Sequence, residues 1–277
     1  MIARRLDPAL LLVAPAVLYL AVVYAVPLGL LLVKSVRTPD GFSLSSFVAF
    51  FADPFSWRVL GNTLRIALWT TLVCLLVGYP VAFALARAKG LPQTALLVAL
   101  ILPLSVGVVV KAFAWQILLR RDGLVSGTLV SLGIVDEPMR LLFTETGLVI
   151  GAVNVFLPFM VMPLYSVIRQ IDPRLMEAAA TLGAGPFHAF RRVLLPLTLP
   201  GAVAGIAFVF SLSIAMYVIP SLLIGDRFQT LATLTGRSFL FMRNERLGST
   251  TAAVLLAVAI AVVMGSGWLA RRMGAAR

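Results

Sequence analysis

The sequence contains few residues of the types that carry out chemistry. It has one cysteine, Cys74, and one histidine, His188, so it can form neither an intrachain disulfide nor a cluster of Cys or His metal ligands. Its lysines are Lys34, Lys89 and Lys111, and none follows a glycine, whereas a phosphate-binding loop requires Gly-Lys-Ser/Thr. We therefore expect no catalytic residue, no metal site and no ATP-hydrolysing motif in this chain.

The composition indicates a membrane protein. Of the 277 residues, 61% are hydrophobic and 12% are charged, and the mean hydropathy is +1.03. Uncharged runs longer than about 18 residues are typical of bilayer spans. The net charge of +12 would suggest nucleic-acid binding in a soluble protein, but basic loops beside anionic lipids explain it better here. We expect an all-α integral membrane protein, one transmembrane domain over residues 1–277, that binds lipid and no nucleic acid.

Six transmembrane helices are predicted from the uncharged runs. They cover residues 8–33, 66–86, 94–110 with an extension to 119 left open, 147–168, 199–220 and 248–270. The apolar stretch 124–132 is too short to span a bilayer. It is predicted to lie along the membrane surface, with a pore-lining re-entrant segment as the alternative. Glycines four positions apart, at Gly147/Gly151 and Gly201/Gly205, predict close helix packing.

Six spans place both termini on the same side of the membrane. The loops on that side hold 11 Lys and Arg in 45 positions, whereas the loops on the other side hold 12 in 91 positions. Because cytoplasmic loops are enriched in Lys and Arg, both termini are predicted to be cytoplasmic. The loop 169–193 between the fourth and fifth spans is then cytoplasmic as well.

This loop is the most informative segment of the chain. Asp172 and Pro173 favour a helix start, and an Ala-rich run continues the helix until Gly183, which suits a left-handed C-terminal cap. A second helix is predicted to start at Pro186 and to pass into the fifth span. Such a helix-turn-helix is predicted to form a rigid protrusion that docks on a partner.

The same loop carries a spaced motif that resembles a known family. Glu177-Ala178-Ala179 is followed by Gly183, Val193 and Leu195-Pro196. This pattern resembles the EAA loop of ABC importer permeases, with Val193 where isoleucine is usual. Further segments resemble the spermidine/putrescine-type subfamily, namely Asn62-Thr63-Leu64, Gly78-Tyr79-Pro80, Trp115, Leu157-Pro158 and Pro220. Lys111 departs from this resemblance, because arginine is expected there and lysine lacks its planar fork.

The resemblance implies a type I ABC importer permease fold with a cytoplasmic coupling loop at 169–196, in a bacterial inner-membrane protein. It implies three kinds of partner: two cytoplasmic ATPase subunits that bind ATP and Mg, a second permease chain, which the subfamily suggests is a related one, and a periplasmic solute-binding protein. The chain itself is then a transport subunit, not an enzyme, for a polyamine or another small solute. The resemblance assigns ATPase coupling to Glu177, Ala178, Ala179, Gly183, Leu195 and Pro196.

Two of these assignments have alternatives. Glu177 is expected either to hydrogen-bond at the docking surface or to brace the loop itself. Ala178 and Ala179 either permit a close approach of the ATPase or reflect helix propensity alone.

Polar, uncharged residues inside the spans are the candidates for lining the solute pathway. They are Asn154, Tyr165, Ser211, Ser213 and Tyr217, although each could instead bond a neighbouring helix. The predicted spans contain no acidic residue. This argues against the main alternative, an ion-coupled secondary transporter, because such proteins use intramembrane carboxylates.

Overall fold

The computed structural model describes residues 8–38 and 41–275 of a helical protein. The basic N-terminal residues 1–7, which entered the charge count above, lie outside the described residues. Five helices within the described part are long and apolar enough to cross a membrane, and a bent helix pair gives a sixth crossing if it counts as one span. The six predicted spans therefore correspond to five helices and one bent pair.

The five long helices are α1 (Pro8–Val36), α3 (Pro54–Arg87), α7 (Glu145–Ile168), α10 (Leu195–Ala215) and α13 (Glu245–Ala275). The shorter ones are α2 (Ser45–Ala52), α4 (Leu91–Ile101), α5 (Val108–Leu118), α6 (Leu124–Ser131), α8 (Arg174–Thr181), α9 (Pro186–Ala189), α11 (Val218–Leu223) and α12 (Leu231–Leu240). Strands β1 (Arg37–Thr38) and β2 (Gly41–Phe42) pair antiparallel, with Arg37 opposite Phe42. A π-helix, Phe190–Leu194, joins α9 to α10, and 3₁₀ turns cover Leu102–Ser105 and Gly225–Arg227.

The second span begins earlier than the prediction of residue 66. Helix α3 starts at Pro54, where the Asp53 side chain accepts a hydrogen bond from the Phe55 backbone N–H at 3.0 Å. Arg65 lies inside the helix, and its guanidinium forms an ion pair with Glu145. Arg65 therefore bounds the uncharged run in the sequence but does not bound the helix.

The third span is not the single straight helix that was predicted. Helices α4 and α5, with the 3₁₀ turn between them, form a pair bent by 103°. The chain is broken where Pro103 removes a backbone donor and Val106 adopts an extended conformation (φ −87°, ψ 127°). Lys111 therefore belongs to the second arm of the bend.

The fifth span ends earlier than the predicted residue 220. Helix α10 stops at Ala215 because Met216 is extended (φ −67°, ψ 128°). Pro220 then lies within the separate helix α11.

Helices α3, α7 and α10 pack against one another and form the core of the bundle. The predicted close approaches at glycines are confirmed: a Cβ on Gly205 would lie 2.7 Å from Met160 Sδ, and one on Gly201 would lie 2.9 Å from the Pro163 carbonyl oxygen. Gly151 lies in close contact with the Leu223 side chain of α11, whereas the closest neighbour of Gly147 is the Leu141 carbonyl oxygen in the turn before α7, so its close approach is not between two helices. Helices α7 and α10 therefore meet at backbone distance, which favours a stiff unit.

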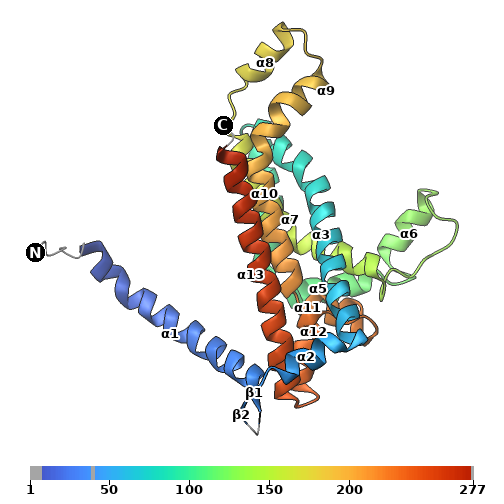
Figure 1. Cartoon of the computed structure of the whole chain (residues 1–277). Helices are drawn as coiled ribbons and strands as arrows, with labels where there is room; N and C mark the ends of the chain where they lie inside the picture. The colour runs from blue at the N-terminus through green and yellow to red at the C-terminus, as the bar shows by residue number, and fades with distance from the viewer. Residues whose placement is uncertain (1–7, 39–40, 276–277) are drawn as a thin grey trace, which may run out of the picture.

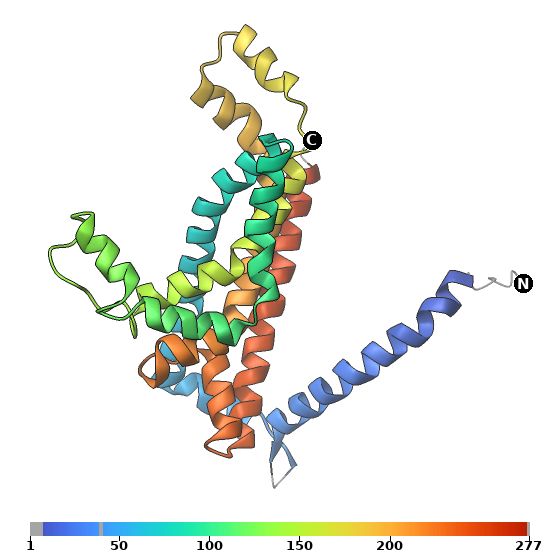
Figure 2. The same cartoon turned by 180° about the vertical axis from the view of Figure 1, so that it is seen from behind.

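Two helices stand apart from this core. Helix α1 extends away from the bundle (Figures 1 and 2), and none of its apolar window is buried. Helix α6 projects from the side of the bundle (Figure 1). Neither of them forms the sharp bend in the chain, which lies between α4 and α5 and was not predicted from the sequence.

The two ends of the bundle carry different structures. Helices α8 and α9 protrude at one end, near the C-terminal end of α13, whereas α2, α12 and the β-hairpin lie at the other (Figure 1). The long helices α10 and α13 run between these ends. A conformational change at one end therefore has to be passed to the other end along these helices.

Candidate functional site

The loop 169–196 forms a short helix that is fixed at both ends. At its start, Asp172 Oδ1 accepts a hydrogen bond from the Arg174 backbone N–H at 2.9 Å. At its end, Gly183 has φ +81°, its N–H donates to the Ala180 carbonyl at 2.9 Å, and the Ala184 N–H donates to the Ala179 carbonyl at 3.0 Å. This pair of hydrogen bonds is a Schellman motif, so the predicted left-handed cap at Gly183 is confirmed.

The outer surface of the loop combines apolar and polar groups. Leu175, Leu182 and Phe187 are 45%, 89% and 75% exposed. The Glu177 side chain is exposed, and no hydrogen bond or ion pair of its carboxylate is found among the described residues. Ala178 is exposed beside it. A surface with large exposed apolar side chains and an unpaired carboxylate is typical of an interaction site.

The six residues of the spaced motif fall into two groups. Glu177, Ala178, Ala179 and Gly183 belong to α8 and its cap, and Ala179 is 9% exposed. Leu195 and Pro196 instead begin α10. Between the two groups lie α9 and the π-helix. The motif therefore marks both the protruding helix and the base through which it joins the bundle.

The π-helix at this base has a local cause. Pro196 has no backbone N–H, so the regular α-helical bond to residue 192 cannot form. The Leu195 N–H donates to the Phe190 carbonyl, five residues earlier. Such wide turns inside helices often occur at functional sites.

Thr198, just beyond the base, contacts α3. Its hydroxyl oxygen lies 2.9 Å from the Tyr79 hydroxyl oxygen, and the side chain is fully buried. The base of the loop is thus bonded to α3 as well as continuous with α10.

The five pathway candidates are not brought together. Tyr165 accepts hydrogen bonds from Gln93 Nε2 at 3.2 Å and from Arg169 Nη1 at 3.3 Å, so it ties α7 to α4. The hydroxyls of Ser211 and Ser213 are buried without a hydrogen-bond partner in the structure. Asn154 is exposed on α7.

Tyr217 alone among the candidates lines a polar cavity, of about 320 Å³. The cavity is formed by Tyr217, Ser221, Gly225, Asp226, Gln229, Thr233, Arg237 and Phe241. Asp226 Oδ1 lies 3.1 Å from Arg237 Nη1, and Gln229 Oε1 is buried with no partner in the structure. Asp226, Gln229 and Arg237 are not among the pathway candidates predicted from the sequence, because those candidates are polar residues inside the predicted spans. The feature of the sequence that could have identified them is the group of acidic and basic residues that follows the fifth span.

The chain resembles known proteins over nearly its whole length. Residues 25–274 match the family described as binding-protein-dependent transport system inner membrane component. The spermidine/putrescine transport system permease protein PotB of Haemophilus influenzae is 34% identical over 259 residues, which cover 89% of this chain and 90% of that protein. PotB of Escherichia coli is also 34% identical, over 87% of this chain and 85% of that protein.

A solved structure shares the fold. It is a bacterial ABC transporter involved in the import of the acidic polysaccharide alginate, and it superposes with a TM-score of 0.75 at 17% sequence identity. The superposition covers 94% of each chain.

Proposed function

The chain belongs to the family of binding-protein-dependent transport system inner membrane components, as a permease subunit of an ABC importer, and we propose that it forms half of the pathway for a polyamine or a related small organic cation. The observation that carries this proposal is the 34% identity to two spermidine/putrescine permeases over at least 85% of each protein. The protruding loop supplies the coupling element that such a subunit requires.

We assign the loop to docking on a cytoplasmic ATPase. Leu175, Leu182 and Phe187 offer apolar surface, and Glu177 offers a carboxylate that no described residue engages. This favours docking over bracing as the role of Glu177. Ala178 lets the partner surface approach the helix closely. Ala179 faces inward and keeps the loop compact.

The proposed assembly contains the partners expected from the motif. Two ATPase subunits bind ATP and Mg on the side of the loop, so the loop and both termini are cytoplasmic. A second, related permease completes the pathway, and a periplasmic binding protein delivers the solute to the other end. This chain supplies no ATP-hydrolysing group and couples hydrolysis to movement.

The cavity at Tyr217 is the proposed point of contact with the solute. The Asp226 side chain is 84% exposed and its partner Arg237 is 36% exposed. Exposed ion pairs are weak, typically up to about 1 kcal/mol, so an ammonium group can compete with Arg237 for the carboxylate. The Tyr217 ring adds a surface that attracts cations.

The test is reconstitution of the full complex in proteoliposomes. We expect ATP-dependent uptake that spermidine or putrescine stimulates when the binding protein is present. Uptake driven by a proton or sodium gradient without ATP would contradict the importer assignment. ATP-driven uptake of a neutral or anionic solute, with no response to polyamines, would retain the importer but reject the cationic substrate.

A further inference from the structure

The cavity at Tyr217 is lined by two segments of the chain. Tyr217 and Ser221 form one wall, the α11 wall, and they follow α10, which ends at Ala215. Gln229 and residues of α12 form the other, the α12 wall. The α11 wall is therefore joined through the chain to the helix that carries the coupling loop. The α12 wall depends on contacts with other helices to keep its place.

The segment that leads into α12 lies on α3. Asn62 Nδ2 donates to the Gln229 carbonyl at 3.2 Å, and the Leu231 N–H donates to Thr63 Oγ1 at 2.9 Å. Leu231 is the first residue of α12, so the second bond satisfies one of the backbone donors that a helix leaves free at its start. Thr63 is 2% exposed and Leu231 is fully buried. Water therefore does not compete for this bond.

Further contacts surround these two bonds. Arg65 lies over the Phe228 ring, with its guanidinium carbon 5.6 Å from the ring centroid. It also pairs with Glu145 at the start of α7. Val59 and Leu231 belong to the same buried apolar cluster. The segment 228–231 is thus held to α3 by residues between positions 59 and 65.

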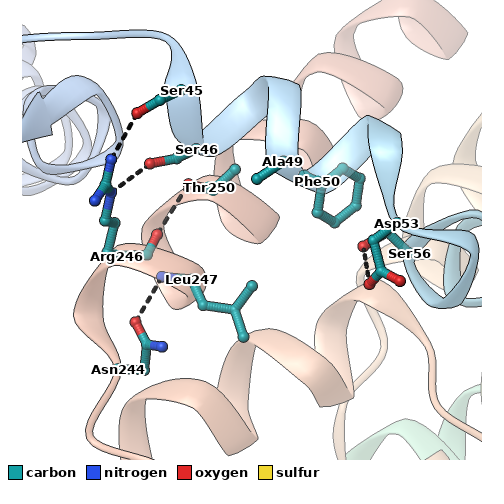
Figure 3. Close-up of a pocket in the computed structure, with 10 residues that line it drawn as sticks. All are labelled: Ser45, Ser46, Ala49, Phe50, Asp53, Ser56, Asn244, Arg246, Leu247 and Thr250. Atoms are coloured by element: carbon teal, nitrogen blue, oxygen red, sulfur yellow. Dashed lines mark hydrogen bonds between the residues drawn. The ribbon is translucent and has the colours of Figure 1, made fainter.

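The end of α3 that makes these contacts is braced by α2 and α13. A second polar cavity, of about 520 Å³, lies between α2 and the start of α13 (Figure 3). There Arg246 of α13 donates hydrogen bonds to the hydroxyls of Ser45 and Ser46 on α2. Asp53, which follows α2, caps α3 by accepting from the Phe55 N–H at 3.0 Å. The α12 wall is therefore attached to an end of α3 that has little freedom of its own.

The other end of α3 contacts the base of the coupling loop. The Tyr79 hydroxyl oxygen lies 2.9 Å from that of Thr198. Asn62 and Tyr79 belong to one continuous helix, Pro54–Arg87, and are about 25 Å apart along its axis at the usual rise per residue. A displacement of the loop base can therefore reach the segment 228–231 through α3.

We propose that Asn62 and Thr63 are positioning residues for transport, which fasten the α12 wall to α3 so that a movement of the coupling loop reaches both walls of the cavity. This inference rests on the proposed function, in which the cavity at Tyr217 contacts the solute. The α11 wall follows α10 through the chain itself, and the α12 wall follows α3 through these two side chains. Neither Asn62 nor Thr63 lines the cavity, so they act through Gln229 and Leu231 and not on the solute.

The reactivity of a cysteine in each wall tests this connection. Ser221→Cys and Gln229→Cys are introduced separately into a Cys74→Ala chain within the full transport complex. The rate of labelling by a small maleimide is compared between the nucleotide-free complex and the complex trapped with ATP and vanadate. At both positions we expect the two rates to differ about tenfold, the factor that about 1.4 kcal/mol supplies.

Two variants of α3 remove the bonds one at a time. With Asn62→Leu or Thr63→Val, the cysteine at position 221 is expected to keep its response to nucleotide, and the cysteine at position 229 is expected to lose it. Thr63→Val leaves the buried Leu231 N–H without its acceptor, so its melting temperature is expected to fall. Asn62→Leu alters a half-buried site and keeps that bond. The pair therefore separates a loss of connection from a loss of stability.

Transport kinetics provide the second measurement, with a matched control. Asn62→Leu and Thr63→Val are expected to retain the ATPase but to lower spermidine uptake per ATP about fivefold, the factor that one hydrogen bond of about 1 kcal/mol supplies. Thr63→Ser keeps the hydroxyl and is expected to restore uptake. The control is Thr235→Val, because Thr235 of α12 donates to Thr251 of α13 at 3.0 Å. It loses a bond of the same kind without touching α3, so uptake per ATP is expected to stay unchanged.

Four results would overturn the proposal. They are an unchanged nucleotide response at position 229 in both α3 variants, no such response in the unmodified complex, an equal loss of uptake in Thr235→Val and Asn62→Leu, and no rescue by Thr63→Ser. The proposed substrate can fail separately, if the unmodified complex does not take up spermidine. The labelling experiment contains no solute and still decides whether α3 connects the loop to the α12 wall.

Discussion

The Tyr79 ring of α3 packs edge-on against the Phe190 ring at the base of the coupling loop, with ring centroids 5.8 Å apart and an interplanar angle of 81°. The Tyr79 hydroxyl also meets Thr198 on α10. A movement of the loop base is therefore passed to α3 directly as well as along α10. Because α3 and α10 both pack on Met160 of α7 through glycines, the three helices are expected to move as one unit.

Tyr79→Phe and Phe190→Leu test this connection. The first removes the hydroxyl contact, worth about 1 kcal/mol, and the second removes an aromatic pair worth about 0.5–1.5 kcal/mol. We expect each variant to assemble with the ATPase but to hydrolyse ATP with less uptake per ATP. Tyr24→Phe on the exposed face of α1 is the control. Additive effects in the double variant would show that the two residues do not act together.

Gly183→Ala is expected to weaken assembly with the ATPase, because an L-residue at φ +81° costs about 1–2 kcal/mol. No atom lies within 4 Å of the added Cβ, so the effect comes from the backbone alone. Gly183→Asn is expected to recover part of the loss, since Asn tolerates this conformation better.

Gly185→Ala is the matched control for the loop. Its added Cβ also meets open space, but its φ is −62°, so it is expected to behave like the unmodified chain. Co-purification of the ATPase with each variant gives the comparison. Equal retention for the substitutions at positions 183 and 185 would mean that the left-handed cap does not shape the docking surface.

Glu177→Ala is expected to leave the melting temperature unchanged, because the side chain is exposed and no described residue bonds to it. Loss of one charged hydrogen bond at the docking surface is expected to weaken ATPase binding about tenfold. Titration of the detergent-purified permease with ATPase measures this. Glu137→Ala, an exposed site in another loop, serves as control. A drop in melting temperature with unchanged ATPase affinity would assign Glu177 to local bracing.

Gly205→Ala is expected to destabilise the fold by about 1–3 kcal/mol, the usual range for overpacking. The new Cβ would lie 2.7 Å from Met160 Sδ and 3.1 Å from the Met160 carbonyl oxygen, and the backbone atom cannot move aside easily. Gly265→Ala on α13, with nothing within 4 Å, is expected to be neutral or stabilising by up to about 1 kcal/mol. Thermal unfolding in detergent compares them, and similar melting temperatures would refute the close α7–α10 approach.

Asp226→Asn is expected to raise the KM for polyamine uptake while stability changes little, because the pair with Arg237 is largely exposed. The comparison with Asp136→Asn isolates the effect of charge at this cavity. An unchanged KM would remove Asp226 from the solute pathway.

Local patterns in the sequence were enough to find most of the helices and the loop. Long apolar runs marked five of the six spans because a bilayer requires about 20 apolar residues of any order. Gly183 was recognised as a left-handed cap because its role depends on its own backbone and its immediate neighbours. The glycine pairs Gly147/Gly151 on α7 and Gly201/Gly205 on α10 were likewise found from their spacing of four residues, which places the two members of each pair on one helix face.

Contacts between distant segments decided the rest. Arg65 on α3 pairs with Glu145, 80 residues later, a contact that no local pattern in the sequence indicates. The polar cavities appear only when the Tyr217 ring packs against Gly236 of α12 and α2 packs beside α13, which places Tyr217 near Arg237 and Arg246 near Ser45. The sequence lists such residues but does not bring them together, because the free energy that joins them comes from packing across the chain rather than from local backbone preference.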